Sequence, residues 1–324
     1  MPKVLFINGQ GPQVADTFVR LAAPGFAIQV LPYGTPQETV FAALSDADYL
    51  VLHPATLTGE AIRQARKLRL IQLLAAGYDK VDLAAAQHAE IPVATNGGAN
   101  AWAVAEHAIA LLLALYKRLT ACDAAVRRGD WRQPVDGFNT FELAGKTVGI
   151  VGAGNIGRKV ARRLHAFETE ILYLDPNPAP ELDESLGARR VGLDELVARA
   201  DVISLHAPLT PSTRGLLGPA QFAAMRPGTV LINTCRAELV DEAALIETLQ
   251  QRKIAGAGLD VFYQEPIRRD HPFLTMDNVL LTPHTAGHAF EGWARRCTFA
   301  WDNIQRVAAG ELPQSQTRSG ESGT

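Results

Sequence analysis

Cysteine is scarce in this sequence of 324 residues. Its three cysteines, Cys122, Cys235 and Cys297, are scattered and odd in number. Small secreted domains that depend on disulfides carry a dense, even set of cysteines, so that class is excluded. The first residues also lack the pattern of a secretory signal, because Met1-Pro2-Lys3 leads directly into an apolar run. Both observations predict a cytoplasmic protein.

Neither sign of charge is in large excess, and no apolar run is long. The 31 basic and 34 acidic side chains give a net charge of −3, so the sequence predicts no nucleic-acid partner. The most apolar segment, residues 108–116, is far shorter than the roughly 20 residues that span a bilayer, so we expect no membrane segment. We also predict no metal site. A hydrophobic content of 47% and a charged content of 20% are typical of a soluble globular protein.

A glycine fingerprint lies in the middle of the chain. Gly152, Gly154 and Gly157 form the pattern G-x-G-x-x-G between an apolar run and a helix-compatible stretch, residues 155–167. Such glycines permit a tight turn, a close approach to a pyrophosphate, and close packing of helix on strand. Asp175 follows the next strand about twenty residues later, where a carboxylate binds a ribose 2′-hydroxyl and repels a 2′-phosphate. The pattern predicts a dinucleotide site that prefers NAD.

Short apolar runs alternate with helical patterns, which favours parallel sheets covered by helices on both faces. The first half contains strand candidates at residues 4–7, 28–31, 49–52, 70–74 and 91–94. Around the fingerprint we predict six more, at residues 147–151, 171–174, 201–205, 229–232, 257–261 and 279–282. A long helical pattern covers residues 100–128 and is apolar on more than one side, so it is expected to be buried between domains or subunits.

The last helical pattern, residues 290–309, has no place in the second sheet and should return to the first domain. The sequence therefore predicts an α/β protein with two doubly wound parallel-sheet domains. The first comprises residues 1–99 and 289–313, and the second comprises residues 100–288. The tail, residues 314–324, is polar and rich in Ser and Gly, and we expect it to be disordered.

Three charged residues follow strands of the second sheet, where ligands of open α/β sheets bind. They are Arg236, Glu265 and His284. A guanidinium grips a carboxylate with a planar fork, and an imidazolium can give a proton to an oxygen near neutral pH. A neighbouring carboxylate favours the protonated imidazole and fixes which ring nitrogen faces a substrate. Together these groups suit hydride transfer between a nicotinamide and a 2-oxo acid.

The chain resembles the D-isomer-specific 2-hydroxyacid dehydrogenase family from Val4 to about Leu312. The matching stretches are Ala75-Ala76-Gly77-Tyr78-Asp79-Lys80-Val81-Asp82, Val104-Ala105-Glu106-His107, Gly152 to Gly157, His206-Ala207-Pro208-Leu209-Thr210, Asn233-Thr234-Cys235-Arg236, Leu239-Val240-Asp241-Glu242, Gly258-Leu259-Asp260-Val261-Phe262, Glu265-Pro266 and Pro283-His284-Thr285-Ala286-Gly287. The resemblance implies a flavodoxin-like substrate domain, a Rossmann NAD-binding domain, an active site in the cleft between them, and a homodimer.

The resemblance also implies roles for individual residues. Arg236 anchors the substrate, His284 is the acid/base and Glu265 tunes it, while backbone around Ala76 and Gly77 holds the substrate carboxylate. Asp260 would bind the nicotinamide carboxamide. The other residues implied at the NAD site are Gly152, Gly154, Asn155, Ile156, Gly157, Asp175, His206, Ala207, Pro208, Thr213, Thr234, Cys235 and Gly287.

The sequence departs from the family pattern at several positions, and some of these departures limit the range of possible substrates. The usual Arg-Gly is Arg236-Ala237 here, and Cys235 is interpreted as a packing residue rather than a redox switch. Phosphite dehydrogenases of the family carry lysine at the position of Ala76, and formate dehydrogenases carry glutamine at that of Glu265, so both are disfavoured. The loops at residues 53–56 and 74–78 contain no Arg or Lys, which disfavours a phosphorylated acid.

A small 2-oxo acid such as glyoxylate, hydroxypyruvate or pyruvate is the predicted substrate, with Trp102, Phe290 and Trp293 as candidates for shaping the pocket or for packing helix faces. Two alternatives stay open. One is a phosphoglycerate dehydrogenase. The other is an NAD(H)-sensing binding protein of the corepressor type, which would keep Arg236, Glu265 and His284.

Overall fold

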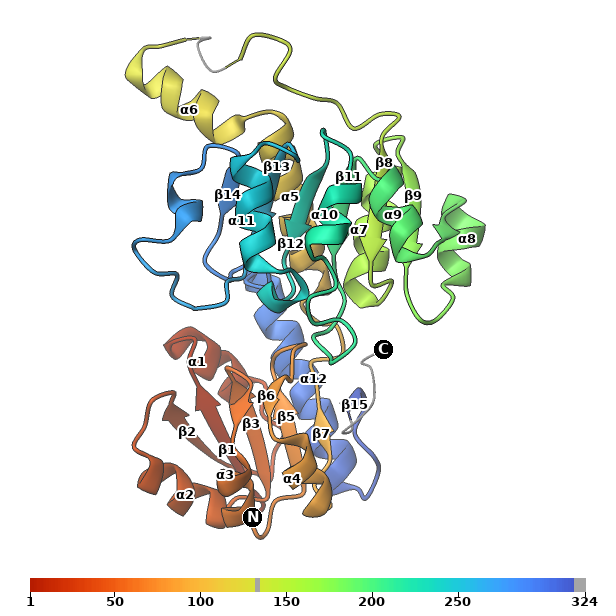
Figure 1. Cartoon of the computed structure of the whole chain (residues 1–324). Coiled ribbons are helices and arrows are strands. Elements are labelled where there is room, and N and C mark those ends of the chain that lie inside the picture. Colours follow the sequence, from red (N-terminus) through yellow and green to blue (C-terminus); the bar gives the residue numbers. More distant parts are fainter. Residues whose placement is uncertain (132–134, 318–324) are drawn as a thin grey trace. The chain divides into compact units, whose positions relative to one another are not determined.

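The structure is a computed structural model that describes residues 1–131 and 135–317. The chain divides into two compact units (Figure 1): unit 1 comprises Met1–Asn100 and the segment from His288 onward, and unit 2 comprises Ala101–Gly287. Each unit is built around a parallel sheet, which confirms the predicted α/β class with two parallel-sheet domains. No helix in the described part of the chain is both long and apolar enough to cross a membrane.

Unit 1 contains a six-stranded sheet in the order β15-β7-β5-β3-β1-β2. Its parallel strands are β1 (Lys3–Asn8), β2 (Ala27–Pro32), β3 (Tyr49–His53), β5 (Leu70–Leu73) and β7 (Val93–Ala94). The helices are α1 (Pro12–Arg20), α2 (Gln37–Ser45), α3 (Gly59–Gln64), α4 (Leu83–His88) and α12 (Phe290–Ala308), and a small parallel pair joins β4 (Thr56–Leu57) to β6 (Lys80–Val81).

Alternate residues of strand β1 enter different cores, because successive side chains of a strand point to opposite faces. Leu5 joins the core formed with α2, α3 and α4, whereas Val4 and Phe6 join the core formed with α1 and α12. Both faces are therefore covered by helices, which explains the nearly continuous apolar strands.

Helix α12 belongs to unit 1 although it follows the whole of unit 2 in sequence. Trp301 is 2% exposed, stacks on Phe18 with ring centroids 4.8 Å apart, and donates its indole N–H to the Phe18 carbonyl at 2.8 Å. The buried Asn303 amide donates to Gln72 in β5 at 2.8 Å. These contacts fix α12 against helix α1 and strand β5, which lie 283 and 231 residues earlier in the sequence.

The prediction of a disordered tail is wrong for its first residues. Gln316–Thr317 forms β15, antiparallel to β7, and the Gln314 backbone N–H donates to the Asn303 side chain at 2.7 Å. A two-residue polar strand leaves no apolar pattern in the sequence, so composition alone could not indicate it. The rest of the predicted tail, residues 318–324, lies outside the described residues.

Unit 2 contains a seven-stranded parallel sheet in the order β10-β9-β8-β11-β12-β13-β14. The strands are β8 (Thr147–Val151), β9 (Glu170–Leu174), β10 (Arg189–Arg190), β11 (Val202–Leu205), β12 (Val230–Asn233), β13 (Gly256–Leu259) and β14 (Val279–Leu281). The six predicted strands are present, and the missed strand, β10, consists of two exposed arginines without an apolar signal. The strand order reverses between β8 and β11, as in a Rossmann sheet, and ligands bind at such a point.

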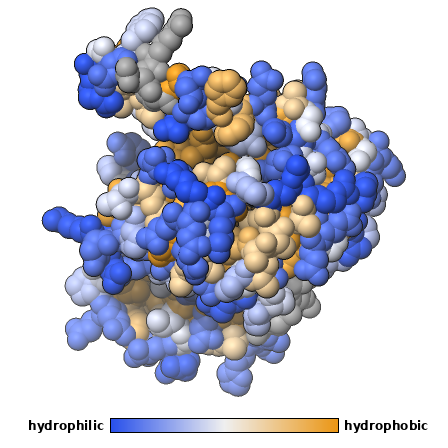
Figure 2. Space-filling view, turned by 45° about the horizontal axis from the view of Figure 1, so that its top comes forward, coloured by the Kyte–Doolittle hydropathy of each residue, from blue (hydrophilic) through white to orange (hydrophobic). Residues whose placement is uncertain are grey.

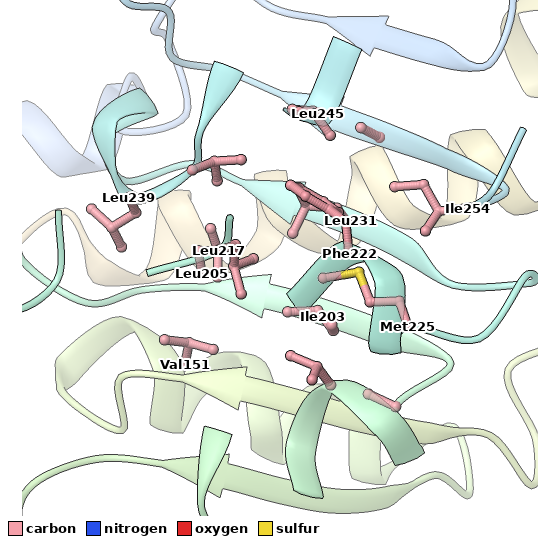
Figure 3. Packing of buried hydrophobic residues seen from close by; sticks show 14 of the residues in the cluster. Val151, Ile203, Leu205, Leu217, Phe222, Met225, Leu231, Leu239, Leu245 and Ile254 are labelled. Atoms are coloured by element: carbon pink, nitrogen blue, oxygen red, sulfur yellow. The ribbon is translucent and has the colours of Figure 1, made fainter. Parts of the chain in front are cut away.

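Helices cover both faces of this sheet. One face carries α5 (Ala101–Tyr116), α7 (Asn155–His165) and α8 (Pro180–Leu186), and the other carries α9 (Leu193–Arg199), α10 (Pro219–Ala224) and α11 (Glu242–Gln250). Figure 3 shows the second core, where Phe222 and Met225 point toward Ile203 and Leu231 of the sheet. Two short 3₁₀ helices, Ala237–Leu239 and Pro272–Thr275, lie in loops that follow strands.

The single long helix predicted over residues 100–128 is wrong, because the structure divides it. Helix α5 ends at Tyr116, and α6 (Leu119–Arg128) begins after Arg118, which has a left-handed backbone with φ of 48°. No glycine or proline marks this break, so the helical pattern continues across it. Helix α6 then projects from the rest of unit 2 (Figure 1).

Candidate active site

The glycine loop of unit 2 connects β8 to α7 and has the shape that a pyrophosphate requires. Gly152 has φ of 93°, and a Cβ there would lie 2.6 Å from the Ala207 backbone nitrogen. A Cβ on Gly157 would overlap the Gly152 carbonyl oxygen. At Gly154, by contrast, a Cβ would meet nothing within 4 Å, so this side of the loop is open. Gly152 and Gly157 are thus needed for the fold, whereas Gly154 leaves the backbone of the loop uncovered by a side chain.

The open side of the loop is the amino end of α7. Gly154 is the N-cap of α7, and no side chain caps this end; Asn155 and Ile156 are its first residues. The first backbone N–H groups of a helix lack partners within the helix, and the dipole there attracts anions. The loop therefore fits the phosphates of a dinucleotide.

Asp175 lies beside the glycine loop at the end of β9. Its carboxylate accepts hydrogen bonds from the backbone N–H groups of Ala153 and Asn177, both at 2.8 Å. Arg190 in β10 donates to the Asp175 carbonyl at 2.9 Å and steadies the backbone behind the carboxylate. A fixed negative charge next to the loop suits a ribose diol and disfavours a 2′-phosphate.

Two polar atoms near the ends of neighbouring strands are buried and have no hydrogen-bond partner: Nδ1 of His206, after β11, and Oγ1 of Thr234, after β12. Burial lowers the pKa of His206 to about 3, so the ring is neutral, and its Nε2 lies 2.8 Å from the Ser204 hydroxyl. Buried polar atoms without partners are rare in folded proteins. A bound dinucleotide at this edge would supply the missing partners.

Other predicted cofactor residues form the loop after β11. The Thr213 hydroxyl donates to the Pro208 carbonyl at 2.6 Å and accepts from the Thr210 N–H at 2.8 Å. Ala207 is 8% exposed, and its backbone nitrogen is the atom that a Cβ on Gly152 would approach. This loop therefore closes against the glycine loop.

Arg236 follows β12 in a turn that is fixed by Asn233. The Asn233 amide donates to the Arg236 carbonyl at 2.9 Å, and its oxygen accepts from the Cys235 N–H at 3.1 Å. The Arg236 guanidinium donates to the Cys235 carbonyl at 2.7 Å. The sequence does not mark Asn233 as a positioning residue, because its contacts are with backbone two and three positions away.

The side chains of His284 and Glu265 lie in contact. The His284 Nδ1 lies 2.8 Å from a Glu265 carboxylate oxygen, and the other oxygen accepts from the Phe262 N–H at 3.1 Å. Both side chains are half-exposed. With Nδ1 engaged by the carboxylate, Nε2 is the nitrogen that can meet a substrate. Arg236, Glu265 and His284 follow β12, β13 and β14 respectively, which are three consecutive strands of one sheet.

His284 has an unusual backbone conformation, with φ of 54°. Non-glycine residues adopt this left-handed region at a cost, and they do so mainly at functional sites and turns. Asp260, at the end of β13, holds the chain on both sides of His284. It accepts the Thr282 hydroxyl at 2.6 Å and the N–H groups of Thr285 and Ala286 at 2.9 and 2.8 Å.

Asp260 was predicted to bind the nicotinamide carboxamide, but its contacts here are with the His284 turn. Its exposed fraction is 0%. His107 in α5 extends this group, since its Nε2 lies 2.9 Å from the Thr282 hydroxyl. No role was predicted for His107 from the sequence; the available signal was its place in the family stretch Val104 to His107. Gly287, another predicted cofactor residue, comes directly after Ala286 and is the last residue of unit 2.

The predicted substrate residues of unit 1 lie after β5. Ala76 is exposed and Gly77 is half-buried. Nearby in unit 1, the ring of Trp293 contacts that of His53 at 5.1 Å, and Phe290 is 90% exposed. In unit 2, the Trp102 ring lies under the Lys159 ammonium at 4.1 Å.

Across residues 1–131 and 135–317, no group of three or more His, Cys, Asp or Glu side chains is arranged to hold a metal.

Comparison with known proteins decides the family. Residues 109–286 match the model of the D-isomer specific 2-hydroxyacid dehydrogenase NAD binding domain. The chain belongs to this family. It is 38% identical over 284 residues to D-3-phosphoglycerate dehydrogenase of Methanocaldococcus jannaschii, covering 87% of this chain and 54% of that one. It is 35% identical to glyoxylate reductase of Thermococcus litoralis, covering 96% and 95%.

Solved structures of the family have the same fold. A glyoxylate reductase from Paecilomyes thermophila superposes with a TM-score of 0.83 at 29% identity, covering 99% of both chains. A formate dehydrogenase from Granulicella superposes with a TM-score of 0.87 at 27% identity, covering 99% of this chain and 100% of that one. The chain spans about half the length of the D-3-phosphoglycerate dehydrogenases that it matches, 54% in the case of M. jannaschii.

Substitutions in the glycine loop should separate folding from cofactor binding. We expect Gly154→Ala to leave the free energy of unfolding within about 1 kcal/mol of wild type, because its Cβ enters open space, yet to weaken NADH binding at least tenfold. Gly152→Ala should lower both the free energy of unfolding and the affinity for NADH, since its Cβ would meet backbone atoms and its φ is positive. Urea denaturation and NADH fluorescence titration measure the two quantities. Unchanged NADH affinity in Gly154→Ala would contradict the assignment.

Thiol labelling tests the interpretation of Cys235 as a packing residue. Burial raises the pKa of Cys235 and of Cys297 to about 12, so both remain unreactive thiols well above neutral pH. We expect iodoacetamide at pH 8 to modify the half-buried Cys122 first, and to modify all three only after unfolding. Mass spectrometry of the peptides reads out the order. Labelling of Cys235 as fast as Cys122 would indicate an accessible thiolate.

Proposed function

We propose that this protein is an NAD-dependent oxidoreductase that interconverts a small 2-oxo acid and its D-2-hydroxy acid. The observation that carries the proposal is the His284–Glu265 pair, 2.8 Å apart, on the same sheet as the glycine loop. Arg236 follows the neighbouring strand. A proton donor, a carboxylate clamp and a dinucleotide loop together are what such a reaction needs.

Each residue has a defined part in the reduction. When bound, NADH supplies the hydride that reaches the carbonyl carbon. Arg236 holds the substrate carboxylate with its planar guanidinium and polarises the carbonyl. His284 donates the Nε2 proton to the carbonyl oxygen, and Glu265 stabilises the protonated ring and fixes its orientation. In the oxidation direction, neutral His284 takes the proton from the hydroxyl.

The residues around the proposed substrate and cofactor positions support a small substrate, and NAD rather than NADP as the cofactor. Ala76 and Gly77 of unit 1 are proposed to hold the substrate carboxylate through backbone N–H groups, and their loop carries no cation for a phosphate. The glyoxylate reductase of T. litoralis matches over 95% of its length. The fixed Asp175 carboxylate beside the glycine loop favours a free 2′-hydroxyl. Unit 1 is accordingly proposed as the substrate domain.

Phosphoglycerate dehydrogenase is the second candidate, because several relatives at 36–38% identity carry that name. The two candidates differ in the need for a cation that binds the substrate phosphate. NADH and NADPH oxidation with glyoxylate, hydroxypyruvate, pyruvate and 3-phosphohydroxypyruvate separates them. Turnover of the small acids with NADH supports the proposal, whereas preference for 3-phosphohydroxypyruvate favours the second candidate. NADH binding without any turnover would favour a nucleotide-sensing protein.

The arginine assignment makes a quantitative prediction. Arg236→Ala should lower kcat/KM for the best 2-oxo acid by at least about a hundredfold, because the carboxylate clamp is lost. The NADH dissociation constant should stay within about twofold, since the Arg236 side chain is assigned to the substrate and not to the nucleotide. Arg226→Ala is the control, because Arg226 pairs with Asp201 at 2.8 Å on the surface. A parallel loss of NADH affinity and turnover would contradict the assigned role.

We also propose that two copies of the chain associate through α6. The helix leaves Leu119 60% and Val126 55% exposed, and Trp131 and Phe138, farther along the chain, are 70% and 90% exposed. Apolar surface also lies beneath this projecting helix in Figure 2. Contiguous exposed apolar surface is typical of an interface.

Sedimentation equilibrium tests the association. We expect a dimer at micromolar concentration, and we expect Leu119→Glu with Val126→Glu to produce a monomer of unchanged helix content, because the charges would lie in the contact. The paired control is Leu312→Glu, which is 69% exposed in unit 1. A wild-type monomer at micromolar concentration would overturn this proposal without affecting the proposed chemistry.

A further inference from the structure

The turn that carries His284 depends on a buried carboxylate. Asp260 has no exposed surface, and it accepts hydrogen bonds from Thr282 before His284 and from Thr285 and Ala286 after it. A buried charge is costly unless donors surround it. The donors that satisfy Asp260 are therefore also the contacts that keep His284 at φ of 54°.

The direction of each hydrogen bond in this group follows from the side chains present. A carboxylate only accepts, so the single Thr282 hydroxyl proton goes to Asp260 at 2.6 Å. The Thr282 oxygen must then accept at its other contact, which is His107 Nε2 at 2.9 Å. His107 is thus the donor, in the tautomer with the proton on Nε2. The same nitrogen lies 3.7 Å from the Asp260 carboxylate.

His107 reaches this group from an element that is rigidly placed. It lies in α5, between Ala105 and Ala108, which are 0% and 2% exposed and belong to the core between α5 and the sheet. The donor is therefore held by the packing of α5 and not by the loop after β14. An alternative rotation of the Thr282 hydroxyl would leave Asp260 one donor short.

We propose that His107 is a positioning residue for His284, acting through Thr282 and Asp260. It orients the Thr282 hydroxyl toward Asp260, and Asp260 in turn holds the left-handed turn that presents His284 to the substrate and to Glu265. His107 itself does not touch substrate. The inference rests on the proposed function only for its catalytic consequence; the hydrogen-bond group is a property of the protein without cofactor.

Two substitutions at His107 isolate the hydrogen bond from the volume of the ring. His107→Leu removes the donor, whereas His107→Gln places an amide N–H near the position of Nε2. We expect His107→Leu to lower kcat roughly tenfold or more, because small displacements of catalytic groups are costly, with the NADH dissociation constant within about twofold of wild type. His107→Gln should recover most of kcat. His165→Leu, exposed at the end of α7, is the matched control and should resemble wild type.

A double-mutant cycle then tests the route. Thr282→Val removes the hydroxyl through which His107 acts. If the route is correct, adding His107→Leu to Thr282→Val should lower kcat little further, because interacting residues are not additive. Fully additive losses, or a His107→Gln variant as impaired as His107→Leu, would overturn the proposal.

Amide hydrogen exchange in the absence of cofactor provides a readout that does not require activity. In His107→Leu we expect faster exchange at the Thr285 and Ala286 amides, which donate to Asp260, with core strands β8 and β11 unchanged. Unchanged exchange at these two amides would contradict the proposed route even if activity fell. An enzyme inactive with every 2-oxo acid would instead count against the proposed function and leave this test intact.

Discussion

Parallel strand pairing is the constraint on which the site of unit 2 depends. Because β8, β11, β12, β13 and β14 run in the same direction, their carboxyl ends meet at one edge of the sheet. Residues separated by more than 100 positions in sequence, from Gly152 to His284, are thereby brought to that edge. Backbone geometry supplies the nucleotide part of the site through the glycine loop. Side chains after β12, β13 and β14 supply the charged part.

Buried polar residues hold the turns that carry these charged side chains. Glu265 contacts His284 directly, whereas Asp260, with no exposed surface, contacts the backbone on either side of it. Asn233 has the same relation to Arg236, since its amide fixes the turn and not the guanidinium. His284 and Arg236 thus each follow a strand and have their turn held by a buried polar residue near the end of a strand, which limits how far they can move.

Much of this could be predicted from the sequence, and the failures have physical causes. Apolar runs located six strands of the nucleotide sheet, and the family pattern located the His284–Glu265 pair. Strand β10 and strand β15 were missed because two-residue polar strands carry no hydrophobic period. The break at Arg118 was missed because a left-handed residue there is imposed by the fold and not by glycine.

The contacts of Asp260 show a different limit. The family pattern identified Asp260 as a site residue, and the structure adds its contacts with the residues on either side of His284. The contacts of the Thr282 hydroxyl and of His107 could not be predicted from the sequence, because their partners are distant in sequence and their residue types are common. Hydrogen-bond direction, which depends on placed atoms, is the information that a sequence lacks.

Arg236, Glu265 and His284, the charged residues of the candidate active site, all belong to unit 2, and this bears on the proposed substrate. In unit 1, Arg296 stacks on the Trp293 ring at 4.3 Å and is 3% exposed, and burial lowers its pKa to about 10. A guanidinium buried in this way is poorly placed to bind a phosphate, whose charge requires exposed or fully paired donors. The proposed small, uncharged acid would accordingly need only the backbone donors proposed at Ala76 and Gly77.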